Sequence, residues 1–171
     1  MFTVRLQKRE CTDERRIEDF LARAETGFLG LTDDGLPYVV PLNFVWMKKR
    51  NAFYFHGAQE GRKMRAMEGG SSGCLTVSES YGTIPDPIPA KTDTAYMSVM
   101  SFGQMELVRD LDEATEAMQA MLDKYAPGYY DTPLAKAHIE RYRSSMGSAT
   151  AVFKLVQQFR SAKENKQRGP S

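Results

Sequence analysis

The stretch FLGLTDDGLPYVVPLNFVWMKKRNAFYFH, residues 28–56, carries two turn signals between apolar runs. The first is Thr32-Asp33-Asp34-Gly35, in which the Asp-Gly pair supplies the positive φ angles of a tight hairpin. The second is Lys48–Asn51, between expected strands at residues 42–47 and 52–56. Strands joined in succession by such turns form an antiparallel meander. This stretch therefore predicts a mainly antiparallel β protein.

Further elements are expected on both sides of this stretch. A helix starts at Thr12-Asp13-Glu14 and ends at Gly27, and a second, with the clearest apolar stripe, covers residues 110–125. The remaining expected elements are short helices at 60–68 and 133–146 and strands at 74–77, 94–107 and 149–159. Gly103 interrupts the 94–107 strand and predicts a bulge or a close backbone approach. About six strands with a few flanking helices favour a closed or nearly closed barrel.

Bulk composition limits the function classes. The 171 residues are expected to form a single domain over 1–160, followed by a polar tail over 161–171. A net charge of +1 gives no field that would attract nucleic acid or an anionic membrane. No secretory segment or membrane span is recognised, so a cytoplasmic location is expected. Cys11 and Cys74 have no metal-ligand spacing, and neither a metal site nor a disulfide is expected.

The segment FYFHGAQEGRK, Phe53–Lys63, carries the chemistry. It is expected to run from a strand through a break at Gly57-Ala58 to a basic helix start. Backbone N–H groups near Gly61 point toward an anion at such a start. Arg62 offers a planar fork and Lys63 a point charge, and both suit a phosphate. The pattern predicts a phosphate site, although the same residues also occur on exposed helices that bind no ligand.

Three blocks carry a family resemblance: Asp34–Asn43, then Tyr54–Ala58 with Gly61–Lys63, then Tyr96, Ser98-Val99 and Phe102-Gly103. With these blocks the chain resembles the FMN-binding split-barrel family related to pyridoxamine 5′-phosphate oxidase, and in particular its nitroimidazole-resistance (Nim-like) branch. The resemblance spans residues 12–159. It implies a six-stranded antiparallel split β-barrel of Greek-key topology with flanking helices, in an α+β chain. It also implies a homodimer with FMN at the subunit interface.

The resemblance also assigns residues to the cofactor. The isoalloxazine edge would be lined by Val40, Pro41, Leu42 and Asn43. The flavin or its ribityl chain would pass beside His56, Gly57 and Ala58. The phosphate would be held by Gly61, Arg62 and Lys63, with Ser98 and Met100 contributed by the partner strand. Family oxidases often have a serine where this chain has Gly61, so a backbone N–H must replace that hydroxyl. The residues that bind the substrate phosphate in the oxidase are not recognisable, which argues against pyridoxamine phosphate as substrate.

Two features remain open to more than one interpretation. His56 is either a structural hydrogen-bonding residue or a proton donor to a reduced substrate, because its reference pKa lies near neutrality. Residues 81–91 contain Pro85, Pro87 and Pro89 and are expected to form a loop that limits access to a pocket.

These observations support several functional hypotheses. The first is an FMN-dependent oxidoreductase that reduces small electron-poor substrates such as nitro compounds, with a nicotinamide electron donor. The second is a flavin- or haem-binding module without turnover, with His56 or His138 as the haem ligand. A deazaflavin-dependent reductase and a structural protein with an empty barrel are further alternatives. The barrel fold alone does not choose among them.

Overall fold

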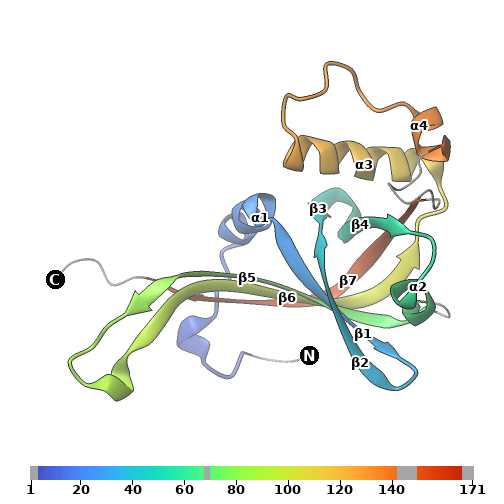
Figure 1. Cartoon of the computed structure of the whole chain (residues 1–171). Helices are drawn as coiled ribbons and strands as arrows, with labels where there is room; N and C mark the ends of the chain where they lie inside the picture. Colours follow the sequence, from blue (N-terminus) through green and yellow to red (C-terminus); the bar gives the residue numbers. More distant parts are fainter. Residues whose placement is uncertain (1–3, 68–69, 142–149, 167–171) are drawn as a thin grey trace.

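A computed structural model describes residues 4–67, 70–141 and 150–166. Its centre is one antiparallel sheet in the order β2-β1-β5-β6-β7-β4-β3 (Figure 1). The strands are β1 (Thr26–Asp33), β2 (Leu36–Asn43), β3 (Val45–Met47), β4 (Ala52–Ala58), β5 (Ser72–Ile84), β6 (Asp93–Leu107) and β7 (Thr150–Asn165). The helices are α1 (Glu14–Arg23), α2 (Arg62–Met67), α3 (Leu111–Tyr125) and α4 (Lys136–Arg141), with single 3-10 turns at Gln7–Arg9, Lys48–Arg50 and Pro89–Lys91.

The mainly antiparallel sheet with flanking helices is as predicted, but the barrel differs in two ways. The described residues form seven strands rather than six, and no ladder closes the sheet. The predicted meander is wrong between the second and third strands, because β2 and β3 stand at opposite ends of the sheet order. Only Phe44 separates them in sequence, and it is fully buried. The two ends of the open sheet are therefore joined by the chain itself.

The core lies on the inner face of the strands. Alternating residues of β1, β4, β5, β6 and β7 point inward, among them Leu29, Phe53, Phe55, Leu75, Val99 and Phe153. Helix α1 covers this core with Ile17, Phe20 and Leu21. The helix starts where Asp13 accepts a hydrogen bond from the Arg16 backbone N–H at 3.2 Å, as an N-cap does. Gly27, expected to end this helix, lies instead inside β1.

Helix α3 forms a second, smaller layer over β3, β4 and β7 (Figure 1), against the face of β4 that carries Tyr54 rather than Phe53 and Phe55. Its apolar stripe of Ala114, Ala117, Met118 and Met121 packs against a cluster from β3, β4 and β7. Asp110 caps its first turn by accepting from the Glu113 N–H at 2.7 Å. The expected helix over 110–125 is confirmed. Of the expected helix at 133–146, α4 covers Lys136–Arg141, and residues 142–149 lie outside the described ranges.

The predicted bulge occurs at Gly103. Phe102 pairs with Phe159, whereas Gly103 pairs with Gln157, so β7 has one extra residue there. A Cβ on Gly103 would overlap the carbonyl oxygen of Val156. Only glycine permits this approach of the two backbones.

Strands β5 and β7 extend farther along the chain than expected. Residues 161–165, expected in a polar tail, belong to β7, which reaches Asn165. Residues 81–84, expected in a proline-rich loop, belong to β5, and residues 82–84 pair with β6. The β5–β6 hairpin therefore extends away from α3 (Figure 1). Within the described ranges, no helix has both the length and the apolarity that crossing a membrane requires.

Candidate functional site

The predicted phosphate segment forms a corner between β4 and α2. Strand β4 does not break at Gly57 and Ala58 as expected, because both pair with β7. The chain turns instead at Gly61, whose φ of +102° is one that glycine adopts freely. The Gly61 carbonyl accepts from the Met64 and Arg65 N–H groups at 3.1 and 3.2 Å. A Cβ on Gly61 would meet open space, so this side of the corner is accessible to a ligand.

Lys63 folds back from α2 over β4. A Cβ on Gly57 would overlap Lys63 Nζ, so the missing side chain at Gly57 makes room for the ammonium group. The same nitrogen lies 5.2 Å from the centroid of the Phe153 ring. Burial lowers the pKa of Lys63. No carboxylate in the described part of the chain pairs with it, so a half-buried cation lacks an anion here.

Arg62, in α2, contacts the β1–β2 hairpin. Its Nε donates to Asp33 Oδ2 at 2.6 Å, and its guanidinium carbon lies 4.7 Å from the centroid of the Tyr38 ring. Cation–π stacking of this kind favours Arg over Lys. Within residues 4–67, 70–141 and 150–166 no hydrogen bond involves its two terminal nitrogens. The Nε edge of the guanidinium is thus held by Asp33, while its two terminal nitrogens are available to a ligand.

The β2 residues assigned to the flavin lie on both faces of that strand. Val40 and Leu42 are half-buried and pack against the core, and Tyr38 shares their face by strand alternation. The basic corner and this apolar strip therefore adjoin through the Arg62–Tyr38 contact. Pro41 and Asn43 are exposed on the outer face.

Ser98 and Met100 also lie on the outer face, on β6. Pro41 pairs with Phe28, Phe28 with Thr76, and Thr76 with Met100, which makes one row across four strands. Three strand spacings separate Pro41 from Met100 by about 14 Å. Within one chain Ser98 and Met100 therefore lie three strands away from the predicted flavin residues of β2.

His56 leaves β4 on the face opposite Gly57, because neighbouring residues alternate along a strand. The side chain keeps solvent contact, yet surrounding protein atoms displace part of its water. This desolvation, and then the positive charge of Lys63, lower the pKa of His56. Both effects favour the neutral form of the imidazole.

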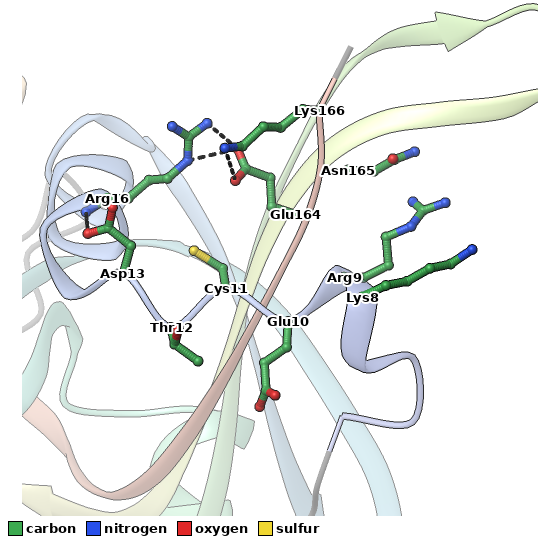
Figure 2. A pocket seen from close by; sticks show the side chains of 10 residues that line it. All are labelled: Lys8, Arg9, Glu10, Cys11, Thr12, Asp13, Arg16, Glu164, Asn165 and Lys166. Atoms are coloured by element: carbon green, nitrogen blue, oxygen red, sulfur yellow. Dashed lines mark hydrogen bonds and ion pairs between the residues drawn. The ribbon is translucent and has the colours of Figure 1, made fainter. Parts of the chain in front are cut away.

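A cavity of about 560 Å³ borders α2 through Met64 and Met67. Two others lie elsewhere in the molecule. A cavity of about 540 Å³ lies between the N-terminal segment and the end of β7 (Figure 2), and its lining includes Cys11, Arg16 and Glu164. Its Arg16 and Glu164 pair with each other. Another of about 510 Å³ is mainly apolar and lies between α3 and α4, with His138 at its wall. The predicted flavin residues line none of these three cavities.

Sequence reasoning missed the two residues that hold Arg62. The local pattern predicts only that Asp33 belongs to a turn and Tyr38 to a strand. No local pattern links either residue to Arg62, since Asp33 lies 29 positions away. The hairpin and the corner come together only through the tertiary fold.

The chain belongs to the pyridoxamine 5′-phosphate oxidase family, because the model of that family matches residues 13–163. The family resemblance expected from the sequence is thereby confirmed. A comparison with curated protein sequences gives no match.

Solved structures of similar fold include several cofactor-binding proteins. The flavocytochrome Anf3 from Azotobacter vinelandii is 26% identical with a TM-score of 0.79, and the match covers 98% of this chain and 73% of that one. An FAD- and haem-binding protein from Mycobacterium smegmatis is 20% identical with a TM-score of 0.74, covering 95% and 77%. A structure described as a 5-nitroimidazole antibiotic resistance protein from Bacteroides thetaiotaomicron is 24% identical with a TM-score of 0.67, covering 90% and 85%.

Proposed function

We propose that this protein is a flavin-binding oxidoreductase that holds FMN with its phosphate at the β4–α2 corner. The observation that carries the proposal is the half-buried Lys63 ammonium above Gly57, which has no carboxylate partner in the described residues. Arg62 stands beside it with its terminal nitrogens available. A phosphate monoester supplies the charge and the acceptor oxygens that these two groups lack.

The remaining residues fit a flavin around this anchor. Gly61 leaves open space on its side of the corner, and its backbone N–H replaces the hydroxyl of the family's serine. Gly57, which has no side chain, leaves room for the Lys63 ammonium to meet the phosphate end of the cofactor. Val40 and Leu42 offer an apolar surface to the ring. The flavin, when bound, supplies the redox chemistry, and the protein supplies position and electrostatics.

A homodimer completes this proposal. Phe28 and Met100 stand in the outer row with 46% and 37% exposure, an apolar surface that no element of the described chain covers. A second copy on this face would bury the row and carry Ser98 and Met100 to the partner's flavin. Phe28→Lys should yield monomers in analytical ultracentrifugation. Leu36→Lys, at a residue 62% exposed at the start of β2, should not.

The proposal is tested by cofactor titration followed by turnover. The purified protein should bind FMN with quenched flavin fluorescence. The bound flavin should then bleach anaerobically with NADH or NADPH and recover its colour on addition of a nitroaromatic substrate. Absence of FMN binding would refute the proposal. Binding without reduction by any donor would instead favour a flavin carrier.

The proposal does not require His56 for flavin binding. Its side chain leaves β4 on the face opposite Gly57, so it is not part of the phosphate site. If it donates a proton to the substrate, His56→Ala should slow reduction and alter its pH profile while the affinity for FMN stays unchanged.

Haem is a second candidate ligand, favoured by the likeness at 26% identity to a flavocytochrome. The chain contains two histidines. His138 Nδ1 accepts a 3.4 Å hydrogen bond from the Ala135 N–H, which places its proton on Nε2 and opposes iron ligation there. His56 is solvent-accessible and its lowered pKa favours the neutral form that binds iron, so it is the better ligand. A Soret band on haemin titration that disappears in His56→Ala would support this alternative, and no band in the wild type would exclude it.

A further inference from the structure

The last turn of α3 meets the chain where β2 passes into β3. Phe44 is the single residue between these strands, and its side chain is fully buried. Because β2 and β3 occupy opposite ends of the sheet order, no strand ladder satisfies the backbone of Phe44. Buried backbone N–H and C=O groups need hydrogen-bonding partners from elsewhere.

Lys124 supplies one partner. Its ammonium group donates to the Phe44 carbonyl at 3.0 Å and to the Leu21 carbonyl, in the last turn of α1, also at 3.0 Å. Its nitrogen lies 3.8 Å from the centroid of the Phe44 ring. One side chain thus ties α1, α3 and the β2–β3 junction together.

Tyr125 supplies the other partner. Its hydroxyl accepts from the Phe44 N–H at 2.9 Å. The same oxygen lies 2.6 Å from the Glu25 carbonyl and 3.0 Å from the Phe44 carbonyl. A hydroxyl has one proton to donate, and the shorter distance gives it to Glu25. Tyr125 therefore satisfies the N–H of Phe44, while Lys124 satisfies its C=O.

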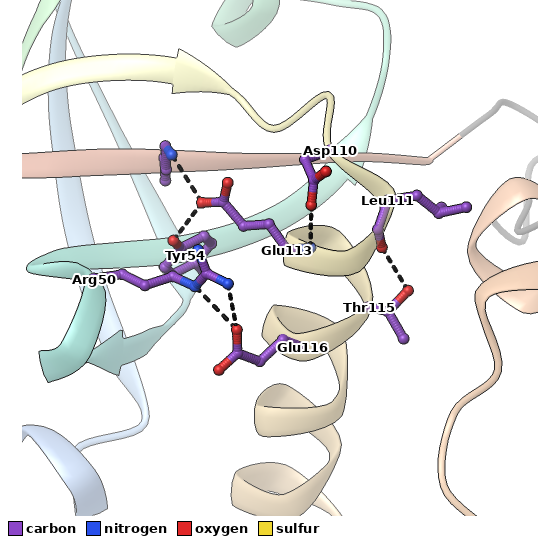
Figure 3. A network of polar contacts seen from close by, with 8 residues as sticks. Arg50, Tyr54, Asp110, Leu111, Glu113, Thr115 and Glu116 are labelled. Carbon is purple, nitrogen blue, oxygen red and sulfur yellow. Dashed lines mark hydrogen bonds and ion pairs between the residues drawn. The ribbon is translucent and has the colours of Figure 1, made fainter.

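The far end of α3 is anchored independently (Figure 3). Glu113 accepts from the Tyr54 hydroxyl at 2.6 Å and from Lys154 Nζ at 2.8 Å, and Glu116 pairs with Arg50. Tyr54 lies on β4 and Lys154 on β7. Helix α3 is thus attached to the sheet at its first turn and to the β2–β3 junction at its last.

We propose that Lys124 and Tyr125 are positioning residues for the flavin ring: by fixing the backbone of Phe44, they set how Leu42 is presented to the isoalloxazine. This inference rests on the proposed function. Neither side chain touches the cofactor. With Phe44 unsecured, the end of β2 samples other conformations, and only the competent fraction binds the ring.

Comparing FMN with riboflavin, which lacks the phosphate, locates the effect. Tyr125→Phe keeps the ring and removes both hydroxyl bonds, so it should weaken FMN and riboflavin binding by the same factor, about tenfold. It should also shift the visible circular dichroism of the bound flavin. Arg62→Ala should weaken FMN binding while riboflavin binding stays unchanged. Lys124→Met should reproduce the Tyr125→Phe pattern through the other bond.

Met121→Ala is the matched control, because Met121 is buried on the same helix and makes no contact that secures Phe44. At a temperature where all variants are folded by far-ultraviolet circular dichroism, it should keep wild-type affinity and flavin spectrum. If Tyr125→Phe behaves like wild type, or if Met121→Ala loses as much affinity and shifts the spectrum equally, the positioning role is refuted. If the wild type binds neither FMN nor riboflavin, the proposed function itself fails.

Discussion

Arg62 donates its Nε proton to the carboxylate of Asp33 across 2.6 Å, linking α2 to the end of β1. The Asp33 side chain is 16% exposed and that of Arg62 is 46% exposed. The bond uses the edge of the guanidinium that a bidentate phosphate contact does not need. The carboxylate therefore orients the cation and, by its charge, opposes an approaching anion.

These two effects of Asp33 can be separated by two substitutions. Asp33→Asn keeps an oxygen that accepts from Arg62 and removes the negative charge, so FMN affinity should rise by about threefold. Asp33→Ala removes the acceptor as well, so Arg62 loses its orientation and FMN affinity should fall by about fivefold. Fluorescence titration with FMN measures both, and riboflavin affinity should stay constant in each. A fall in both variants would show that repulsion by Asp33 is insignificant.

Arg62 and Lys63 should together account for most of the phosphate's contribution to binding. Replacing both by Ala is expected to weaken FMN binding by about 2–4 kcal/mol, since charge-assisted contacts are each worth roughly 1.5–3 kcal/mol and overlap here. Arg65→Ala, which removes an exposed positive charge from the same helix, is the control and should cost little. Equal losses in the two variants would mean that only net charge matters.

The local structure around these residues was predictable from short sequence patterns. The Asp34-Gly35 turn has φ angles of 50° and 75°, as an Asp-Gly hairpin requires. Asp110 caps the helix whose apolar stripe was visible, and Gly103 marks a true bulge. Each of these features depends on residues close together in sequence.

Long-range features were not predictable in the same way. Residues 42–47 read as one strand, but the apolar Phe44 divides them because it enters the core between two sheet ends. Its partner Tyr125 lies 81 positions away, and no periodicity signals that bond. His56 and Gly57 lie on opposite faces because β4 continues through Ala58. The Gly-Ala pair predicted instead that the strand would end before these residues.

Glu113 should be the main electrostatic anchor of α3. Burial acts to raise the pKa of Glu113, but the bonds from Lys154 and Tyr54 outweigh it and lower that pKa. Glu113→Gln should cost about 2 kcal/mol in denaturant unfolding, because the Lys154 ammonium loses its charged partner. The exposed pair of Glu116 with Arg50 provides the control, and Glu116→Gln should cost about 0–1 kcal/mol.

Glu113 should also make the fold less stable as the pH falls. A carboxylate with a lowered pKa adds stability that is complete above its unfolded pKa, near 4.5, and is lost as the pH falls through the lower folded value. Wild type and Glu113→Gln should therefore converge in stability under acid conditions. A constant difference down to pH 2 would contradict the ionised form of Glu113 in the fold.

Lys124 should make the free energy of unfolding increase as the pH rises. Burial lowers its pKa from 10.5 to about 8, although Glu25 acts to raise it. Between those two values the unfolded chain binds more protons, so the Lys124 contribution rises with pH over this window. The carboxylates of Glu18, Asp19 and Asp123 line the same cavity as Lys124, and Glu25 is the carboxylate that acts on its charge. The free energy of unfolding of wild type relative to Lys124→Met should therefore increase from pH 8 to 10.5, and a flat difference would contradict the lowered pKa.

Gly103 should be the least replaceable glycine of the sheet. In Gly103→Ala the new Cβ meets the Val156 carbonyl, a backbone atom that moves only with its strand, so the expected loss is about 3 kcal/mol or more in thermal or denaturant unfolding. Gly30→Ala is the control on β1, where the Cβ would lie 3.5 Å from the Cys74 carbonyl, an ordinary contact. Equal stability of the two variants would mean that the bulge relaxes.

The bulge at Gly103 also has a consequence for how the fold can diverge. Beyond it β6 and β7 pair in a separate register, from Phe102 with Phe159 out to Tyr96 with Asn165. Insertions or deletions in the β5–β6 hairpin are therefore absorbed on that side and leave the strand pairing around the basic corner unaltered. Descendants of this scaffold can exchange the hairpin as a module, changing what it reaches without rebuilding the site behind it.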